Sequence, residues 1–311
     1  MSELPRFSPR RPLGSTGFDV TRIGIGDLAD RSVPLETCVA TLRRALDAGL
    51  NLVDTAPNYE DGYSEQVVGA ALAGRRSGIF VIDKVDHWDR PVLPQVGASL
   101  GRLGFDNVDL FVFHSVSSLE AWAQIMRPDG PWSELEDCRG AGHCRFIGLS
   151  SHDPRVLRAA LDAGRADILM FPVGPYVDAR YVDEILPLTR ERGVGSVCFK
   201  TFGAGKLLGD TEGYGRALSQ RPRGKLSSGG ADSAEPTLPR LSVEECVRYT
   251  LTLDPDVALL GMSFPNEQDA ALHAAARFQP FSPTELAEVR QRAEPAIRDK
   301  GPCWWNPANP L

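Results

Sequence analysis

Short apolar segments alternate with longer amphipathic segments along most of the chain. The apolar segments have the length of β-strands, and the segments that follow them repeat apolar residues at the spacing of an α-helix. The strand-like segments span 21–26, 50–54, 78–84, 107–114, 144–151, 166–172, 194–200 and 256–261. The helix-like segments span 35–49, 64–74, 91–104, 117–139, 153–164, 179–193, 242–253 and 266–278. Alternating strands and helices form parallel sheets, and eight such units predict an α/β fold, a closed (β/α)8 TIM barrel.

Two stretches lie outside this repeat. Residues 209–241 follow the seventh strand and are rich in Gly, Ser, Pro and Arg, so they form either a long loop on the catalytic face or a disordered insertion. Residues 277–311 contain an extra C-terminal helix and an irregular tail. In this tail, Trp304 and Trp305 either reach over the pocket mouth or cover apolar surface. No segment has the composition of a linker, so residues 1–311 are expected to form a single barrel domain.

Three ionisable residues end successive predicted strands. Asp54, Lys84 and His114 are separated by 30 residues each, about the length of one strand-helix unit. In a (β/α)8 barrel the carboxyl ends of the strands share one face, and that face carries the active site. Tyr59 lies on the turn-rich loop after Asp54, before a helix that Ser64 is expected to cap. We therefore expect these strand-end residues and the tyrosine to converge.

The four residues together have the chemistry of an acid for a carbonyl oxygen. A tyrosine, with a reference pKa of about 10, donates a proton poorly at neutral pH unless a cation stabilises its phenolate. Lys84 would lower the pKa of Tyr59, and Asp54 would hold the ammonium in place. His114 would hydrogen-bond the reacting oxygen. Such a site suits hydride addition to a carbonyl, which requires a nicotinamide cofactor because no side chain supplies hydride.

Six segments occur in the order and at the separations of a known protein family. They are RPLGSTGFDVTRIGIG, DTAPNYEDGYSEQVVG, FVIDKV, DLFVFH, FIGLSSH and LLGMSFPNEQ, within roughly residues 11–275. Together they resemble the aldo-keto reductase family. The resemblance implies the (β/α)8 barrel and an NAD(P)H-dependent reductase that transfers hydride reversibly to a small aldehyde or ketone. It also implies a catalytic set in which Tyr59 is the general acid, assisted by the other three residues.

The resemblance further implies a set of cofactor contacts. The expected residues are Ser150, Ser151, Met170, Phe199, Lys200, Phe202, Gly203, Gly205, Lys206, Gly261, Ser263, Glu267 and Gln268. The first three would hold the nicotinamide carboxamide, although the family usually has Asn and Gln at the second and third positions. Phe199, or Lys200 beside it, marks the position of the ring that stacks on the nicotinamide. The glycine-rich segment 202–207 would lie along the pyrophosphate, and 261–268 near the adenosine phosphate.

The sequence leaves two alternatives open for the cofactor, for the substrate pocket and for the activity. Members that prefer NADP commonly have Lys or Arg near the 2′-phosphate, but residues 262–276 contain neither, so NADP(H) and NAD(H) are both candidate cofactors. His87 and Trp88, just beyond Lys84, either line the substrate pocket or lie on a surface loop. The alternative function is a nucleotide-binding regulatory or redox-sensing barrel with little turnover.

The charge composition of the chain limits the classes of molecule that it is expected to bind. The net charge of −7, from 34 Lys and Arg against 41 Asp and Glu, gives no basic footprint for nucleic acid or an anionic membrane. The first residues contain no apolar core of signal-peptide length, and no apolar run downstream has the length of a membrane span, about 18 residues. We therefore expect a cytoplasmic protein that acts on a small carbonyl compound. A monomer is the family default.

No metal site is expected. Cys138, His143 and Cys144 lie close together in the sequence, but no second pair of ligands matches them. A metal-dependent barrel hydrolase built on Asp54 and His114 would need further His or carboxylate ligands at strand ends, and the sequence does not supply them.

Overall fold

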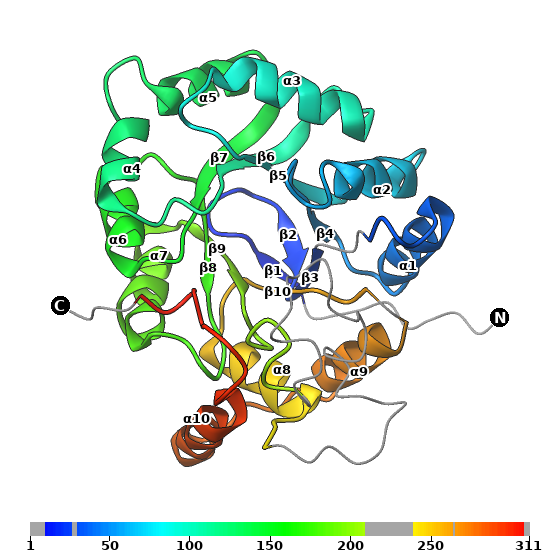
Figure 1. Cartoon of the computed structure of the whole chain (residues 1–311), viewed down its shortest axis with the longest axis vertical. Coiled ribbons are helices and arrows are strands. Elements are labelled where there is room, and N and C mark those ends of the chain that lie inside the picture. Colours follow the sequence, from blue (N-terminus) through cyan, green and yellow to red (C-terminus); the bar gives the residue numbers. More distant parts are fainter. Residues whose placement is uncertain (1–9, 27–29, 209–238, 264, 308–311) are drawn as a thin grey trace.

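Eight parallel strands close into a barrel, as the sequence pattern predicts (Figure 1). They are β3 (Ile23–Gly26), β4 (Leu52–Asp54), β5 (Phe80–Val85), β6 (Val108–Phe113), β7 (Cys144–Ser150), β8 (Ile168–Pro172), β9 (Gly195–Phe199) and β10 (Val257–Leu260). The strands pair in sequence order, and β10 pairs with β3 to complete the closure. This computed structural model describes residues 10–26, 30–208, 239–263 and 265–307, so most of the long loop predicted at 209–241 lies outside the described residues.

Helices surround the barrel on its outer side (Figure 1). They are α1 (Leu35–Asp47), α2 (Tyr63–Leu72), α3 (Val92–Leu103), α4 (Leu119–Ile125), α5 (Pro131–Gly140), α6 (Pro154–Ala163), α7 (Leu186–Arg192), α8 (Val243–Leu253), α9 (Pro265–Ala276) and α10 (Pro283–Ile297). A π-helical turn, η1 (Tyr181–Ile185), leads into α7. Within the described residues, no helix is long and apolar enough to cross a membrane.

Two helix predictions need correction. The helical stretch expected over 117–139 is two helices, α4 and α5, because Pro128 lacks a backbone N–H and Asp129 adopts a left-handed φ of 54° between them. Ser64 does not cap α2. The helix starts one residue earlier, after Gly62 at φ 82°, and the Ser64 hydroxyl instead accepts a hydrogen bond from Thr55 Oγ1 at 2.8 Å.

The core has separate inner and outer parts. Alternate strand residues such as Phe80, Ile82 and Leu110 fill the barrel interior, while Val81, Phe111 and their equivalents pack against the helices. A hairpin that the sequence pattern did not reveal, β1 (Arg10–Pro12) with β2 (Asp19–Thr21), closes one end of the interior. A Cβ added at Gly14 in this hairpin would lie 2.3 Å from the backbone nitrogen of Gly195, at the amino end of β9. The hairpin therefore seals the end of the barrel opposite the strand carboxyl ends.

The C-terminal segment packs against the barrel. Ser282 and Glu285 form a reciprocal capping box at the start of the predicted extra helix, α10. Beyond α10, Trp305 is fully buried and its indole N–H donates to the carbonyl oxygen of Tyr176 at 2.9 Å. The carbonyl oxygen of Trp305 in turn accepts from the Tyr181 hydroxyl at 2.9 Å. These bonds fix the tail across the end of the barrel where the strand carboxyl termini lie.

Candidate active site

Lys84 lies at the end of β5 with only 2% of its surface exposed. Its Nζ donates to Asp54 Oδ1 at 2.6 Å and to the carbonyl oxygen of Thr55 at 2.6 Å. Two charges removed from water are tolerated only when they pair closely, and β4 and β5 are neighbours whose ends present the partners to each other. Burial raises the pKa of Asp54, and the Lys84 charge opposes this shift. The pair therefore holds an ammonium group at a fixed place on the barrel floor.

The loop between β4 and α2 carries Tyr59 over this ammonium. Glu60 and Asp61 adopt left-handed φ angles of 52° and 51°, and Gly62 follows at 82°, where an added Cβ would lie 2.7 Å from Arg102 Cδ. This tight turn brings the chain back toward the barrel. The Lys84 Nζ lies 4.5 Å from the centroid of the Tyr59 ring. A cation at this position favours the negatively charged form of the phenol.

His114 follows β6 and meets Tyr59 edge to face, with ring centroids 5.6 Å apart and planes at 80°. Its Nδ1 lies 2.6 Å from Oδ1 of Asp86, so Nδ1–H donates to this carboxylate and Nε2 remains available to the cavity. Burial and the Lys84 charge lower the pKa of His114, whereas Asp86 raises it. The net effect is a neutral ring near pH 7 whose free nitrogen is a hydrogen-bond acceptor.

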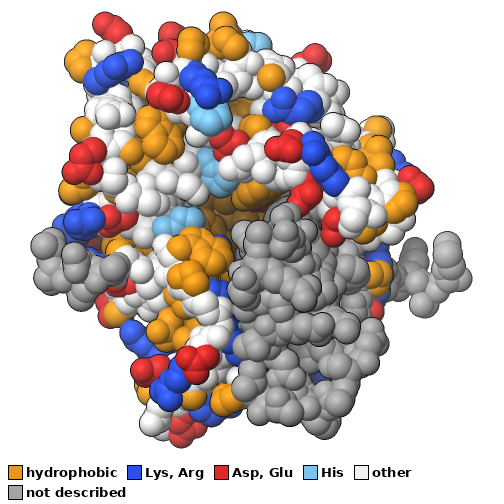
Figure 2. Space-filling view, in the orientation of Figure 1, with side chains coloured by type: hydrophobic (Ala, Val, Ile, Leu, Met, Phe, Trp, Pro, Cys, Tyr) orange, Lys and Arg blue, Asp and Glu red, His pale blue; other side chains and the backbone are white. Residues whose placement is uncertain are grey.

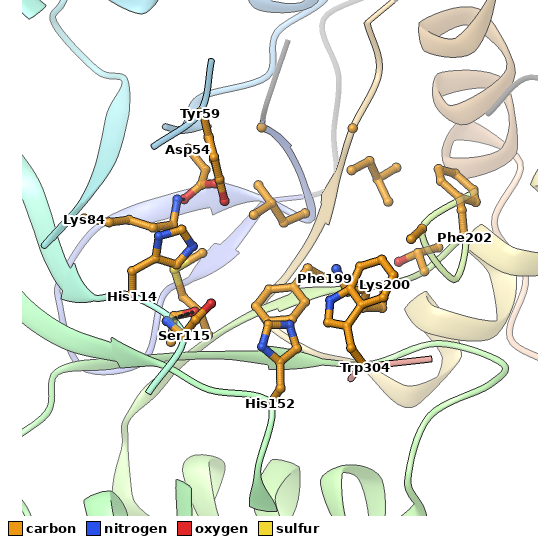
Figure 3. Close-up of a pocket in the computed structure, with 18 of the residues that line it drawn as sticks. Asp54, Tyr59, Lys84, His114, Ser115, His152, Phe199, Lys200, Phe202 and Trp304 are labelled. Carbon is orange, nitrogen blue, oxygen red and sulfur yellow. Dashed lines mark hydrogen bonds and ion pairs between the residues drawn. The ribbon is translucent and has the colours of Figure 1, made fainter. Parts of the chain in front are cut away.

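These four side chains face a cavity of about 470 Å³ at the carboxyl ends of the strands. Figure 3 shows Asp54, Tyr59, Lys84 and His114 along one side of it. Histidine side chains border a hollow on the corresponding face of the molecule (Figure 2). The structure thus brings together all four residues for which the sequence predicted catalysis.

The same cavity contains many of the predicted cofactor residues. Those that line it are Ser150, Met170, Phe199, Lys200, Phe202, Gly205 and Gly261. Phe199 ends β9, and the chain after it bends through left-handed φ angles at Lys200 (75°) and Gly205 (82°). Turns of this kind let the backbone approach a ligand closely, and this segment holds its own shape through bonds such as Gly203 N–H to the carbonyl oxygen of Lys200 at 2.9 Å.

The other predicted cofactor residues lie outside the cavity lining. They are Ser151, Gly203, Lys206, Ser263, Glu267 and Gln268. The Ser151 hydroxyl accepts from the Asp153 backbone N–H at 3.0 Å and helps to start α6. Gln268 is fully buried and its amide donates to the carbonyl oxygen of Thr41 at 2.8 Å, which ties α9 to α1. Lys206 is buried beneath the tail, where its Nζ contacts the carbonyl oxygen of Pro302.

The structure also locates the two residues considered for the substrate pocket. His87 is exposed, and its carbonyl oxygen accepts from the Gln95 amide at 2.7 Å on the surface. Trp88 packs against the outer hydrophobic core. Neither belongs to the cavity lining. Trp304 instead lines the cavity with 43% of its surface exposed, while Trp305 covers apolar surface.

Three residues near the cavity were not singled out from the sequence for these roles. Asp86 holds His114, and the ring of His152 lines the wall beside Phe199. Thr201 also lines the cavity, and its hydroxyl is buried without a hydrogen-bond partner among the described residues. The only sequence signal was that each lies within two residues of a strand end, the position where barrel active sites gather. In the part of the chain that the structure describes, no group of three His, Cys, Asp or Glu side chains is placed to hold a metal ion.

Comparison with known proteins identifies the family. The model of the Aldo/keto reductase family matches residues 22–292. The chain belongs to this family. It is therefore an oxidoreductase of the aldo-keto reductase type, and its cofactor is NAD(P)(H), which the family uses.

Individual proteins that resemble this chain agree with this assignment. The chain is 29% identical to the NADH-specific methylglyoxal reductase of Escherichia coli over 227 residues, covering 64% of this chain and 68% of the relative. It is 26% identical to the L-galactose dehydrogenase of Arabidopsis thaliana over 309 residues, covering 92% of this chain and 94% of that protein. An aldo-keto reductase from Bacillus halodurans in its holo form has the same fold, with a TM-score of 0.70, 24% identity and coverage of 93% and 96%.

Proposed function

We propose that this protein reduces the carbonyl group of a small aldehyde or ketone with NAD(P)H, and that the reaction is reversible toward the alcohol. The observation that carries the proposal is the position of the Lys84 ammonium. It is bound to Asp54 at 2.6 Å and lies 4.5 Å from the Tyr59 ring centroid, at the side of a cavity large enough for a small substrate.

Tyr59 is the proposed general acid. As a carbonyl oxygen becomes negative, the phenol donates its proton to it, and Lys84 stabilises the phenolate that remains. Asp54 keeps the ammonium at this place through the bond to its Oδ1. In the reverse direction, the Tyr59 phenolate takes the alcohol proton, so that the same residue serves both directions of the reaction.

The lining residues fit a nicotinamide dinucleotide. The aromatic ring of Phe199 offers a flat surface, and the segment that follows passes along the cavity through left-handed turns. The buried Thr201 hydroxyl, unpartnered among the described residues, belongs to the same segment and is a further donor for an anionic group. When bound, the cofactor supplies the hydride.

Steady-state oxidation of NADPH and NADH with a panel of small aldehydes and ketones tests the proposal. Wild-type protein should oxidise at least one dinucleotide in a carbonyl-dependent manner. Tyr59→Phe should lower kcat/KM by at least about 100-fold, because it removes the donated proton and keeps the ring. The dissociation constant of the dinucleotide, measured by quenching of tryptophan fluorescence, should stay nearly unchanged.

Two outcomes would contradict this proposal. Equal turnover by wild type and Tyr59→Phe would remove the tyrosine from the chemistry. Tight dinucleotide binding without turnover of any carbonyl would favour the regulatory barrel instead.

A further inference from the structure

His152 is a polar side chain on the cavity wall that the proposed chemistry does not use. It follows β7, and its ring centroid lies 5.2 Å from that of Phe199 with the planes tilted by 51° (Figure 3). Its backbone N–H donates to Ser117 Oγ at 3.1 Å. The backbone bond and the ring contact together hold the imidazole at one place on the wall.

The imidazole of His152 has unused hydrogen-bonding capacity. Its Nε2 is buried and has no hydrogen-bond partner in the described part of the chain. Burial, followed by the charge of Lys200, lowers the pKa of His152 to about 3, so the ring is neutral at physiological pH. A neutral imidazole offers one donor and one acceptor, and a half-turn of the ring lets either nitrogen face the cavity. Polar atoms that stay unpaired in a buried place cost free energy, which a ligand atom recovers by pairing with them.

The location of His152 separates it from the cavity floor. Ser150 and Met170 at the floor are only 2% and 1% exposed, whereas His152 is partly exposed and Trp304 near it is 43% exposed. Figure 3 shows His152 and Trp304 on the side of the cavity away from Tyr59. A small molecule whose carbonyl meets Tyr59 has His152 on the opposite side of the cavity.

We propose that His152 is a specificity-determining residue that hydrogen-bonds a second, uncharged oxygen of the substrate. The substrate class is then small aldehydes and ketones that carry a hydroxyl or keto oxygen near the reacting carbonyl. Plain alkyl carbonyls leave the imidazole unpaired, and a neutral ring has no charge with which to attract a carboxylate. This inference rests on the proposed reductase function.

The test compares glyceraldehyde with propanal, which has the same number of carbons and lacks the hydroxyls. His152→Phe keeps a ring against Phe199 and removes both nitrogens. It should lower kcat/KM for glyceraldehyde by about tenfold and leave kcat/KM for propanal within about threefold of wild type. Each substrate is compared with itself and the two are assayed on one preparation, so aldehyde hydration and the active fraction cancel in the ratio.

Two further variants sharpen this comparison. His152→Gln retains a donor and an acceptor and should keep part of the preference for glyceraldehyde. His87→Phe, the same substitution at an exposed histidine outside the cavity, should change neither substrate. The dissociation constant of the dinucleotide should be the same in all of these proteins.

The contrary results are distinct. Equal loss for glyceraldehyde and propanal with unchanged dinucleotide binding would show a structural role, and equal loss with weaker dinucleotide binding would show a cofactor contact; either result overturns the inference. Failure of the reductase proposal would look different, because wild type would turn over neither aldehyde or Tyr59→Phe would remain fully active.

Discussion

A charged residue that is buried needs a partner of opposite charge, so its pairing can be predicted from the sequence. Lys84 follows an apolar strand, and an ammonium at such a position is costly without a nearby carboxylate, so its pairing with Asp54 follows from the sequence. Asp86 carries no comparable signal, because it lies just past a strand end where an aspartate is ordinary in a turn. Its contact with His114 depends on how two loops fold back over neighbouring strands, which local sequence does not specify.

Asp86 should act as a positioning residue for His114. Because this carboxylate raises the pKa of the imidazole, Asp86→Asn should lower the pKa of His114, which NMR titration of the ring C–H signals measures. We expect kcat/KM to fall between about 10-fold and 100-fold, since the ring loses its fixed proton position. Asp89→Asn, on the exposed surface nearby, is the matched control. An unchanged His114 titration in Asp86→Asn would contradict the assigned contact.

At the scale of elements, the order of strands and helices was predictable and several contacts between helices were not. Alternation of short apolar and amphipathic segments locates all eight barrel strands. The segment 262–276 contains no cation, yet Arg44 of α1 donates to Gln268 Oε1 at 3.2 Å and so stands at the start of α9. Residues 224 positions apart meet there because barrel closure makes the first and last helices neighbours. Local reading of one segment cannot find such a residue.

Two helical glycines should respond in opposite ways to alanine. A Cβ at Gly69 in α2 would lie 2.2 Å from the carbonyl oxygen of Leu103, so Gly69→Ala should destabilise the fold by about 1–3 kcal/mol. Gly97 in α3 has open space around its Cβ position, and Gly97→Ala should stabilise by about 0.5–1 kcal/mol because alanine favours the helix. Urea unfolding of the two variants measures both changes. Equal effects would show that α2 and α3 are packed differently.

At the scale of the whole molecule, the sequence predicted the barrel. It did not predict how the β1–β2 hairpin and the C-terminal tail cover the two ends of the barrel. The segment 10–21 is too short and irregular to show strand alternation, and its hairpin forms because Leu13 and Val20 fill the open end of the interior. The tail is similar. Its two adjacent tryptophans gave two equal interpretations, and only the packed structure assigns burial to Trp305 and the cavity to Trp304.

Substitutions of the two tail tryptophans should therefore have different effects, one on stability and the other on substrate binding. Trp305→Ala removes a fully buried side chain and should lower the free energy of unfolding by about 3–5 kcal/mol. Trp304→Ala should change stability by less than about 1 kcal/mol because the side chain is 43% exposed, while raising KM for the carbonyl substrate. Urea unfolding and steady-state kinetics on both variants test this division. Similar stability losses in the two would contradict it.

Single-turnover kinetics test most directly whether hydride passes from NAD(P)H to the carbonyl carbon while Tyr59 protonates the oxygen. Protein saturated with NAD(P)H deuterated at the nicotinamide C4 is mixed with an aldehyde, and the rate of dinucleotide oxidation is followed with the mass of the alcohol formed. We predict deuterium at the former carbonyl carbon and a rate at least about 100-fold lower in Tyr59→Phe than in wild type. An alcohol without deuterium from either C4 position, or equal rates in the two proteins, would show that the Asp54, Lys84, Tyr59 and His114 cluster does not perform this reaction.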